Sequence, residues 1–403
     1  MKTKNPTLQP SRFLVTTSAM QIANQVIRVF VGVLFIFSGL IKLNDPVGTK
    51  IKLEEYFEVF AVDFAWAAGF FHFLVPLALG IAVILCVAEV VLGVALLLRY
   101  RLKTTLWILL SIIVFFTFLT FYSAYYNKVT DCGCFGDAIK LEPWQSFGKD
   151  VLLLVLIAVL ITQRNQLTSN DSRRTGIYVA SATAVCTLIG ISAIFFLPPI
   201  DFLPYKIGDN IAENMKLPPG APTDIFEITY TLKNKASGET QKMTDKEYIS
   251  TEIWKDSTWQ IIHTSDPKLL QKGVRPKITD FSVTTPEGDD ITPQVFTGTK
   301  LFIVMRDVKQ ASESQLSKIS ELIEGLQGKP VEIMLLTATD GILFEEYRHE
   351  YQLAAPYYFT DNTVLKTMIR TDPGVLLLKN GTVINKWPAI LIPSAGAITK
   401  STD

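Results

Sequence analysis

The chain has 403 residues, with 38 basic and 38 acidic side chains, so its formal net charge is zero. This balance excludes the strongly basic composition of a nucleic-acid-binding protein, and no nucleic-acid partner is expected. Apolar residues make up 49% of the chain. They are concentrated before about Pro198, and the remainder has the composition of a soluble domain.

Five stretches are long and apolar enough to cross a lipid bilayer, which takes about 20 residues. They lie near 19–43, 72–98, 104–124, 144–162 and 176–197. No cleavage signal follows the first stretch, so it is expected to remain as a span. We predict a tail at 1–18, a four-helix unit at 19–165 and a fifth span at 175–198. A linker with a small β region is expected at 199–278, a second domain at 279–395 and a tail at 396–403.

Basic residues in short loops predict the orientation, since they favour the cytoplasmic side. They occur in three places that five spans would put on one side of the membrane: Lys2, Lys4 and Arg12; Arg99, Arg101 and Lys103; Arg164, Arg173 and Arg174. The loop expected after the first span also carries Lys42, Lys50 and Lys52, which weakens the pattern slightly. We predict a bacterial inner membrane protein with a cytoplasmic N-terminus and a periplasmic C-terminal domain.

Glu89 lies within the second predicted span. An ionisable group at that depth is costly and should face the bundle interior or water. It could transfer protons or contact a quinone, which would then be a cofactor of the protein. Alternatively, it is a protonated glutamate that bonds to a neighbouring helix.

Four cysteines are too few for a disulfide-rich scaffold. Cys86 and Cys186 lie in apolar runs and are expected to be packing residues. Cys132 and Cys134 instead lie in the polar segment DCGCFGD, on the side predicted to be oxidising. A disulfide across one glycine should be strained, and strained disulfides tend to be more oxidising. The alternatives are a structural clip, half of a metal site or inert thiols; no further ligand lies nearby, so no metal is predicted.

The first four spans resemble the DoxX-like superfamily and, within it, the methylamine utilisation branch MauE, over about residues 20–165. The resemblance rests on FSGLIKLNDPVGTKIKLEEY, on Glu89 and on DCGCFGDAIKLEPWQS. It implies a four-helix membrane unit associated with thiol or quinol chemistry outside the cytoplasm. By this analogy, Cys132 and Cys134 would exchange disulfides with a partner protein. The fifth span and the soluble tail depart from the family pattern.

The soluble half alternates predicted strands and helices, which indicates an α/β domain with parallel strands. Strands are expected at IFEITYTLKN, TWQIIHTS, KLFIVM, VEIMLLTA and PYYFTD, and helices at TDKEYISTEIWK, SESQLSKISELIEGL, GILFEEYRHEYQL and NTVLKTMIR. Ser312 is a candidate N-cap. VLLLKNGTVINKW should form a hairpin with a type I′ turn at Asn380–Gly381.

This order of elements resembles the thioredoxin-like fold of the periplasmic TlpA type over about residues 279–395. Pro373 takes the place of that fold's cis-proline. Active members carry C-x-x-C after the first central strand, but here that position is RDVKQAS and no cysteine follows Cys186. We therefore predict a fold without the reaction, in which Arg306, Asp307 and Lys309, together with Pro373, bind a partner protein. Alternatively, the three charged residues form a solvated loop.

Two functions fit these patterns. The first is a redox-associated envelope protein that exchanges disulfides or electrons with a periplasmic partner through Cys132 and Cys134. The second is a non-enzymatic envelope protein that scaffolds or binds partners through its degenerate thioredoxin-like domain.

Overall fold

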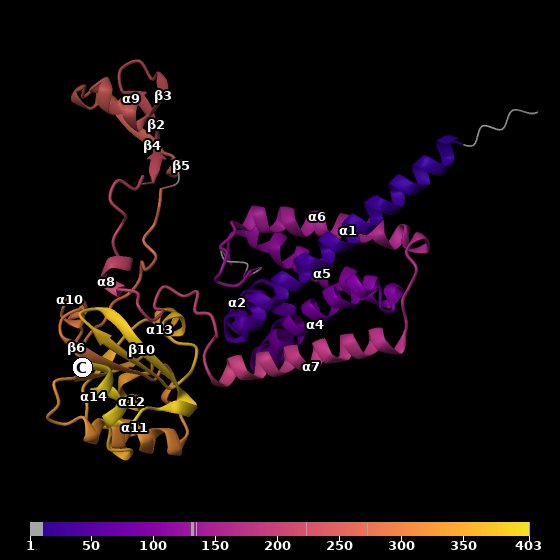
Figure 1. Cartoon of the computed structure of the whole chain (residues 1–403). Coiled ribbons are helices and arrows are strands. Elements are labelled where there is room, and N and C mark those ends of the chain that lie inside the picture. The colour runs from indigo at the N-terminus through magenta and orange to yellow at the C-terminus, as the bar shows by residue number, and fades with distance from the viewer. Residues whose placement is uncertain (1–10, 130–132, 134, 223, 272, 403) are drawn as a thin grey trace, which may run out of the picture.

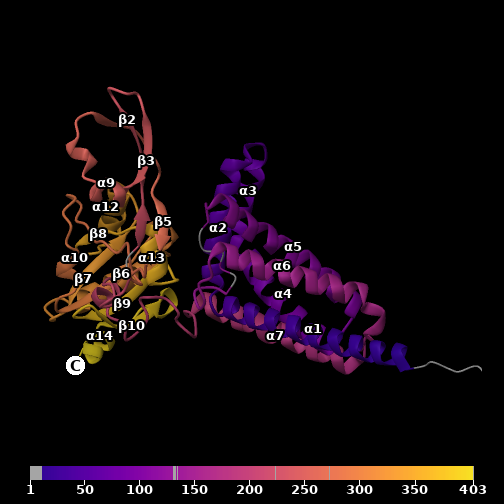
Figure 2. The same cartoon turned by 90° about the horizontal axis from the view of Figure 1, so that it is seen from above.

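The computed structural model describes residues 11–129, 133, 135–222, 224–271 and 273–402. It shows a bundle of long helices, a domain built around a sheet and a small β unit that projects from that domain (Figure 1). The bundle comes first in the chain. The sheet domain stands at one end of it (Figures 1 and 2).

Within the described residues, five helical segments have the length and hydropathy to cross a membrane, as predicted. They span Ala19–Asn44, Ala65–Leu98, Leu102–Tyr126, Pro143–Thr162 and Arg173–Phe195. Four belong to single helices: α1 (Ser11–Asn44), α5 (Leu102–Tyr126), α6 (Pro143–Thr162) and α7 (Arg173–Phe195). The remaining span combines η1 (Ala65–Ala67), α3 (Ala68–Leu74), η2 (Val75–Leu77) and α4 (Ala78–Leu98). Pro76 lies in η2, where its missing N–H favours a break in the α-helix.

The segment after the first span is a helix, α2 (Pro46–Asp63), and the expectation of a loop was wrong. Asp45 caps it by accepting a hydrogen bond from the Gly48 amide at 2.8 Å. Its buried face carries large side chains, among them Tyr56 and Phe60. The Phe60 ring lies 4.8 Å from the Tyr122 ring in an edge-on arrangement. Charged residues are frequent in this segment, and its apolar residues show no clear helical periodicity, so the sequence indicated a loop.

The two basic loops between spans meet at one end of the bundle. The Asn170 amide donates to the Arg99 carbonyl at 2.9 Å, and the Arg101 amide donates to Asp171 Oδ1 at 2.7 Å. In α1, Arg28 Nη1 donates to the Leu96 carbonyl at 3.0 Å. The sheet domain lies at the opposite end of the bundle (Figure 1).

The sheet domain contains five strands in the order β10-β9-β6-β7-β8. Their bounds are β6 Thr299–Val304, β7 Glu332–Thr337, β8 Tyr357–Phe359, β9 Gly374–Lys379 and β10 Thr382–Pro388. Strands β6, β7 and β8 are parallel, whereas β9 is antiparallel to both β6 and β10. The parallel unit β6-α11-β7 followed by the hairpin β9-β10 and a helix is the predicted thioredoxin-like topology.

Helices cover both faces of this sheet. They are α11 (Glu313–Gly325), α12 (Gly341–Glu350), α13 (Asn362–Met368) and α14 (Ala395–Thr402). Successive side chains of β6 point to opposite faces of the sheet, as in any β-strand, and each face has its own hydrophobic core. Leu301 and Ile303 pack with residues of α11, α12 and α14. Phe302 and Val304 pack with residues of α13 on the other face.

Several local predictions for this domain are confirmed. The Gln315 amide donates to the Ser312 side chain, which caps α11 within a capping box. Asn380 and Gly381 have φ values of 49° and 75°, as a type I′ turn requires. The Asp372–Pro373 peptide bond is cis.

Two boundaries of this domain differ from expectation, because both flanking segments contribute to its core. Tyr205 and Ile211 were assigned to a linker, but both are buried against the α13 face of the sheet. Ile211 begins the short helix α8 (Ile211–Asn214). Residues 396–403 were assigned to a tail, but α14 occupies most of them and Ile398 is fully buried.

The small β unit contains a two-stranded and a three-stranded sheet, in the orders β1-β5 and β3-β2-β4. The bounds are β1 Ile225–Glu227, β2 Thr229–Asn234, β3 Thr240–Thr244, β4 Trp259–Thr264 and β5 Lys268–Gln271. The single predicted strand from Ile225 is divided into β1 and β2. Strands β3 and β5 were missed because both are short and polar. The predicted helix between strands is present as α9 (Asp245–Ser250).

Candidate functional site at the junction of the two halves

The cysteines of the DCGCFGD segment, Cys132 and Cys134, lie outside the described residues. Their neighbours Gly133, Phe135, Gly136 and Asp137 are described. Gly133 and Gly136 have φ values of 62° and 50°, a region that residues with a side chain rarely adopt. These two glycines therefore let the segment turn tightly at the end of the bundle that faces the sheet domain.

Arg370, at the end of α13, joins the sheet domain to this segment. Its Nη2 donates to Asp137 Oδ2 at 2.7 Å, and its Nε donates to Asp45 Oδ2 at 2.7 Å. Its Nη1 donates to the Lys366 carbonyl at 2.7 Å within its own domain. The Arg370 side chain is only 6% exposed, so these charge-assisted bonds form largely away from water.

Two further contacts tie the halves together. Asn44 Nδ2 donates to the Ile200 carbonyl at 2.8 Å, and the Ile200 amide donates back to Asn44 Oδ1 at 3.0 Å. Lys386 Nζ in β10 lies 2.8 Å from Asp201 Oδ2, in the segment that leaves α7. Burial lowers the pKa of Lys386, while Asp201 acts in the opposite direction. Both contacts fix the sheet domain close to the membrane half.

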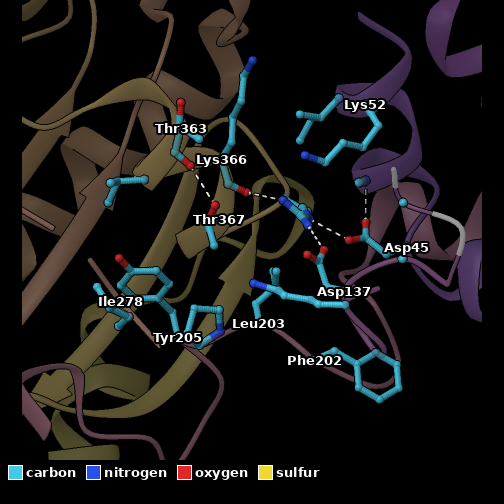
Figure 3. Close-up of a pocket in the computed structure, with 18 of the residues that line it drawn as sticks. Asp45, Lys52, Asp137, Phe202, Leu203, Tyr205, Ile278, Thr363, Lys366 and Thr367 are labelled. Atoms are coloured by element: carbon cyan, nitrogen blue, oxygen red, sulfur yellow. Dashed lines mark hydrogen bonds and ion pairs between the residues drawn. The ribbon is translucent and has the colours of Figure 1, made fainter. Parts of the chain in front are cut away.

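A hollow of about 270 Å³ lies where Arg370 meets the membrane half (Figure 3). We call it the loop hollow. Gly133, Gly136 and Lys52 line it from the membrane half, and Lys366 and Thr367 line it from α13. In Figure 3, dashed lines run from Asp45 and Asp137 to one guanidinium, which is that of Arg370, since Arg370 pairs with both carboxylates. The loop hollow therefore reaches the segment that carries the cysteine pair.

Asp372 organises the place where active thioredoxin-like proteins carry their cysteines. Its Oδ1 accepts from the Arg306 amide at 2.9 Å, and its Oδ2 accepts from the Asp307 amide at 3.0 Å. The Arg306 side chain also pairs with Asp372, with Nε 3.4 Å from Oδ2. Burial raises the pKa of Asp372, whereas Arg306 and the two amides act to lower it. An ion pair thus occupies the position of the missing dithiol, next to cis-Pro373.

This surface faces the chain's own α2 rather than open solvent. Arg306, Asp307 and Asp372 line a second hollow, of about 460 Å³, whose other wall includes Val47 and Glu58 of α2. We call it the Arg306 hollow. Lys309 is exposed, and it does not line this hollow. Of the four predicted partner-binding positions, Arg306 and Asp307 therefore line the Arg306 hollow, whereas Lys309 and Pro373 do not.

Glu89 lies in a second polar cluster, inside the helix bundle. It is 2% exposed, pairs with Lys42 of α1 and accepts a hydrogen bond from Ser38 Oγ at 3.0 Å. Lys42 was counted with the loop after the first span, but it belongs to α1 and points into the bundle. Glu89 thus bonds to a neighbouring helix, as one interpretation of the sequence expected, and its partner is a lysine.

A second buried ion pair completes the intramembrane cluster. Lys149 and Asp150 of α6 pair with each other, and Thr120 Oγ1 of α5 donates to Asp150 Oδ2 at 3.0 Å. Lys149 Nζ also lies 5.4 Å from the centre of the Phe135 ring, so this aromatic residue of the DCGCFGD segment covers the cluster. The two pairs line a hollow of about 20 Å³.

The size of that hollow limits what can bind beside Glu89. About 20 Å³ holds one water molecule. Small-molecule sites usually occupy about 300–1,000 Å³, far more than this hollow. The quinone contact of Glu89 stays a prediction. Among the residues the structure describes, no group of three or more metal-ligating side chains is gathered.

Reasoning from the sequence missed Arg370, Asp137 and Asp45. Arg370 lies 233 residues from Asp137 and 325 residues from Asp45 along the chain. No local pattern connects positions so far apart. The only signal in the sequence was Asp137 at the end of DCGCFGD, because this acidic residue has no evident role in thiol chemistry.

Residues 20–163 match the family model of the methylamine utilisation protein MauE. The match covers α1 to α6 and includes Lys42, Glu89 and the DCGCFGD segment. It confirms the MauE resemblance for this region, whereas the wider relation to DoxX stays a prediction. The fifth span and the sheet domain lie outside it. No curated protein shows significant similarity to the chain.

The sheet domain is similar to several solved thioredoxin-like structures. StoA from Bacillus subtilis is 16% identical, with a TM-score of 0.25, over 30% of this chain and 96% of that one. A thioredoxin-like protein from Aeropyrum pernix is 13% identical, with a TM-score of 0.26, over 30% of this chain and 88% of that one. The fold assignment rests on the strand order and the helix positions described above.

Proposed function

We propose that this chain is a thiol–disulfide exchange protein of the bacterial inner membrane, in which Cys132 and Cys134 exchange a disulfide with a thiol-bearing periplasmic protein. The observation that carries the proposal is the bond between Arg370 and Asp137. It holds a thioredoxin-like domain without cysteines against the polar segment that contains the chain's CxC pair. A thioredoxin-like domain that lacks cysteines thus contacts Asp137, five and three residues after Cys132 and Cys134 in the sequence.

The exchange is balanced without any further reactant. A thiolate of the partner attacks one sulfur of the Cys132–Cys134 disulfide and releases the other sulfur as a thiolate. The partner's second thiol, as its thiolate, then resolves the mixed disulfide. The CxC pair is reduced to a dithiol and the partner's dithiol is oxidised to a disulfide. The basic side chains of the loop hollow favour thiolates at this end of the bundle.

The orientation belongs to the same proposal. The arginines of the two short loops lie at the end of the bundle opposite the sheet domain. Arginine-rich short loops favour the cytoplasm. The CxC segment and the sheet domain would then lie in the oxidising periplasm, where a disulfide persists.

Trapping tests the chemistry directly. Cys132→Ser and Cys134→Ser each leave one thiol, which can attack the disulfide of the oxidised partner in the reverse direction of the exchange. The second sulfur that would resolve this mixed disulfide is missing, so the mixed disulfide should accumulate. The matched controls are Cys86→Ser and Cys186→Ser, because both of these thiols are buried and free. A partner that co-purifies equally with the double variant Cys132→Ser, Cys134→Ser, with no mixed disulfide from either single variant, would instead support a non-enzymatic scaffold.

A further inference from the structure

The loop hollow and the Arg306 hollow adjoin each other. Ile51 of α2 and Lys366 of α13 line both. We call the combined space the interdomain groove. It begins at Gly133 and Gly136 of the DCGCFGD segment and ends beyond the Arg306–Asp372 pair.

One wall of the groove is a regular stripe on α2. Val47, Ile51, Glu54 and Glu58 line it at intervals of three or four residues, which places them on one helix face. At 1.5 Å per residue, the distance from the first to the last is about 16 Å. An extended chain rises about 3.3 Å per residue, so this wall can accommodate roughly five residues.

The opposite wall belongs to the sheet domain. It includes Arg306 and Asp307 at the end of β6, Thr339 after β7 and Asp372 before β9. These positions surround the cis-proline of the fold. The Ala338 side chain also lines the groove and is exposed, so space remains in front of it.

The two ends of the groove differ in charge. Among the residues that the structure describes, the loop hollow is lined by five basic side chains and three acidic ones: Lys52, Lys140, Lys277, Lys366 and Arg370 against Asp45, Asp137 and Asp280. The Arg306 hollow is lined by four acidic side chains and three basic ones: Glu54, Glu58, Asp307 and Asp372 against Lys50, Arg306 and Lys366. The end next to the CxC segment therefore attracts acidic groups, and the far end does not.

We propose that the interdomain groove binds an extended segment of a protein substrate, with acidic side chains next to its cysteine, and leads that cysteine to the CxC segment. The inference rests on the proposed thiol exchange for its purpose. Its binding step can be measured without that chemistry. A small molecule would leave most of the 16 Å wall uncovered, whereas an extended polypeptide matches its length and its change in charge.

Binding is tested with full-length protein in detergent micelles and labelled ten-residue peptides in which serine replaces the cysteine. One peptide carries aspartates beside this serine, and its counterpart carries lysines. We expect the acidic peptide to bind about tenfold more tightly, a difference of about 1.4 kcal/mol, and the difference should shrink as salt is added. Equal affinity of the two peptides would contradict the proposed preference.

A groove-filling variant locates the site. Ala338→Trp places a large side chain in the Arg306 hollow and should weaken binding of the acidic peptide about tenfold. The matched control is Ala236→Trp, in the exposed turn between β2 and β3, which should leave binding unchanged. Unaltered binding by Ala338→Trp would show that the groove is not the site.

Exchange with dithiothreitol separates this inference from the proposed function. A small dithiol does not need the groove, so wild type and Ala338→Trp should oxidise it at the same rate. If the wild type does not oxidise dithiothreitol, thiol exchange is contradicted. The affinities for the peptides then test the groove by themselves. If only Ala338→Trp fails to oxidise dithiothreitol, this substitution disturbs the CxC segment. The affinity of Ile51→Trp for the acidic peptide then tests the groove, because Ile51→Trp fills it from α2.

Discussion

Arg370 Nη2 lies 2.7 Å from Asp137 Oδ2, although 233 residues separate them in the chain. This bond, with its counterpart to Asp45, fastens the thioredoxin-like domain to the segment that holds the CxC pair. Asp45 also caps α2 through the Gly48 amide. One guanidinium thus connects α13, the start of α2 and the DCGCFGD segment.

Replacing Arg370 should release the sheet domain from the bundle. Arg370→Ala removes the charge-assisted bonds to two partly buried carboxylates, which typically costs about 2–5 kcal/mol. Hydrogen–deuterium exchange should rise in the first turns of α2 and in α13, while β6 and β9 stay protected. The control is Arg275→Ala, because Arg275 is 73% exposed and lies 3.6 Å from Asp224. Unchanged exchange in α2 after Arg370→Ala would show that other contacts hold the domain.

The buried pair of Lys42 and Glu89 should respond strongly to single substitutions and weakly to a double one. Lys42→Met or Glu89→Met alone breaks the buried pair by removing one partner, which costs about 3–5 kcal/mol, whereas replacing both removes the two charges together. Unfolding by sodium dodecyl sulfate, measured for the wild type, the two single variants and the double variant, gives the coupling free energy between the two side chains. The partly exposed pair Lys50–Glu54 should couple by less than about 1 kcal/mol.

The same double variant addresses the role of the intramembrane cluster. If Lys42→Met, Glu89→Met is folded and still exchanges disulfides at the wild-type rate, the pair only stabilises the bundle. A folded protein with slowed exchange would assign the pair a part in the reaction, since Phe135 links the cluster to the CxC segment.

Asp372 should make the stability of the sheet domain depend on pH. Burial raises its pKa in the folded state, so the folded protein holds this proton more tightly than the unfolded chain does. The contribution of Asp372 to the free energy of unfolding is therefore fully present below the pKa of the unfolded state, near 3.9. It is lost as pH rises through the raised pKa of the folded state. Asp372→Asn should remove this decline. Thermal unfolding of full-length protein between pH 4 and pH 7 measures the difference, and parallel profiles for the two proteins would contradict it.

The orientation can be tested at both ends of the chain. A reporter that is active only in the periplasm should work when fused after Asp403, and one that is active only in the cytoplasm should work when fused before Met1. The physical reason is the set of arginines in the two short loops, which resist translocation. Activity of a cytoplasmic reporter after Asp403 would overturn the predicted orientation.

The sequence by itself determined the elements whose cause is local. Five long runs of apolar residues predicted the five spans. The hydrocarbon core of a bilayer offers no hydrogen-bond partners, so the backbone groups of each span must bond to one another within a helix. Ser312 marked the start of α11 and Asn380–Gly381 the turn between β9 and β10, since each depends on the conformation of a few adjacent residues. Alternating strands and helices, with Pro373 before the last hairpin, identified the topology of the second domain.

Only the tertiary structure decided which charges meet. Lys42 was assigned to a solvent-exposed loop until the packing of α1 against α4 placed it beside Glu89. Arg306 and Asp307 were expected on an open surface, but α2 forms the facing wall of their hollow. The partners of Arg370 could not be found from the sequence, because an ion pair depends on distance in space and leaves no periodic pattern along the chain. The site at the junction is therefore a product of how the two halves pack.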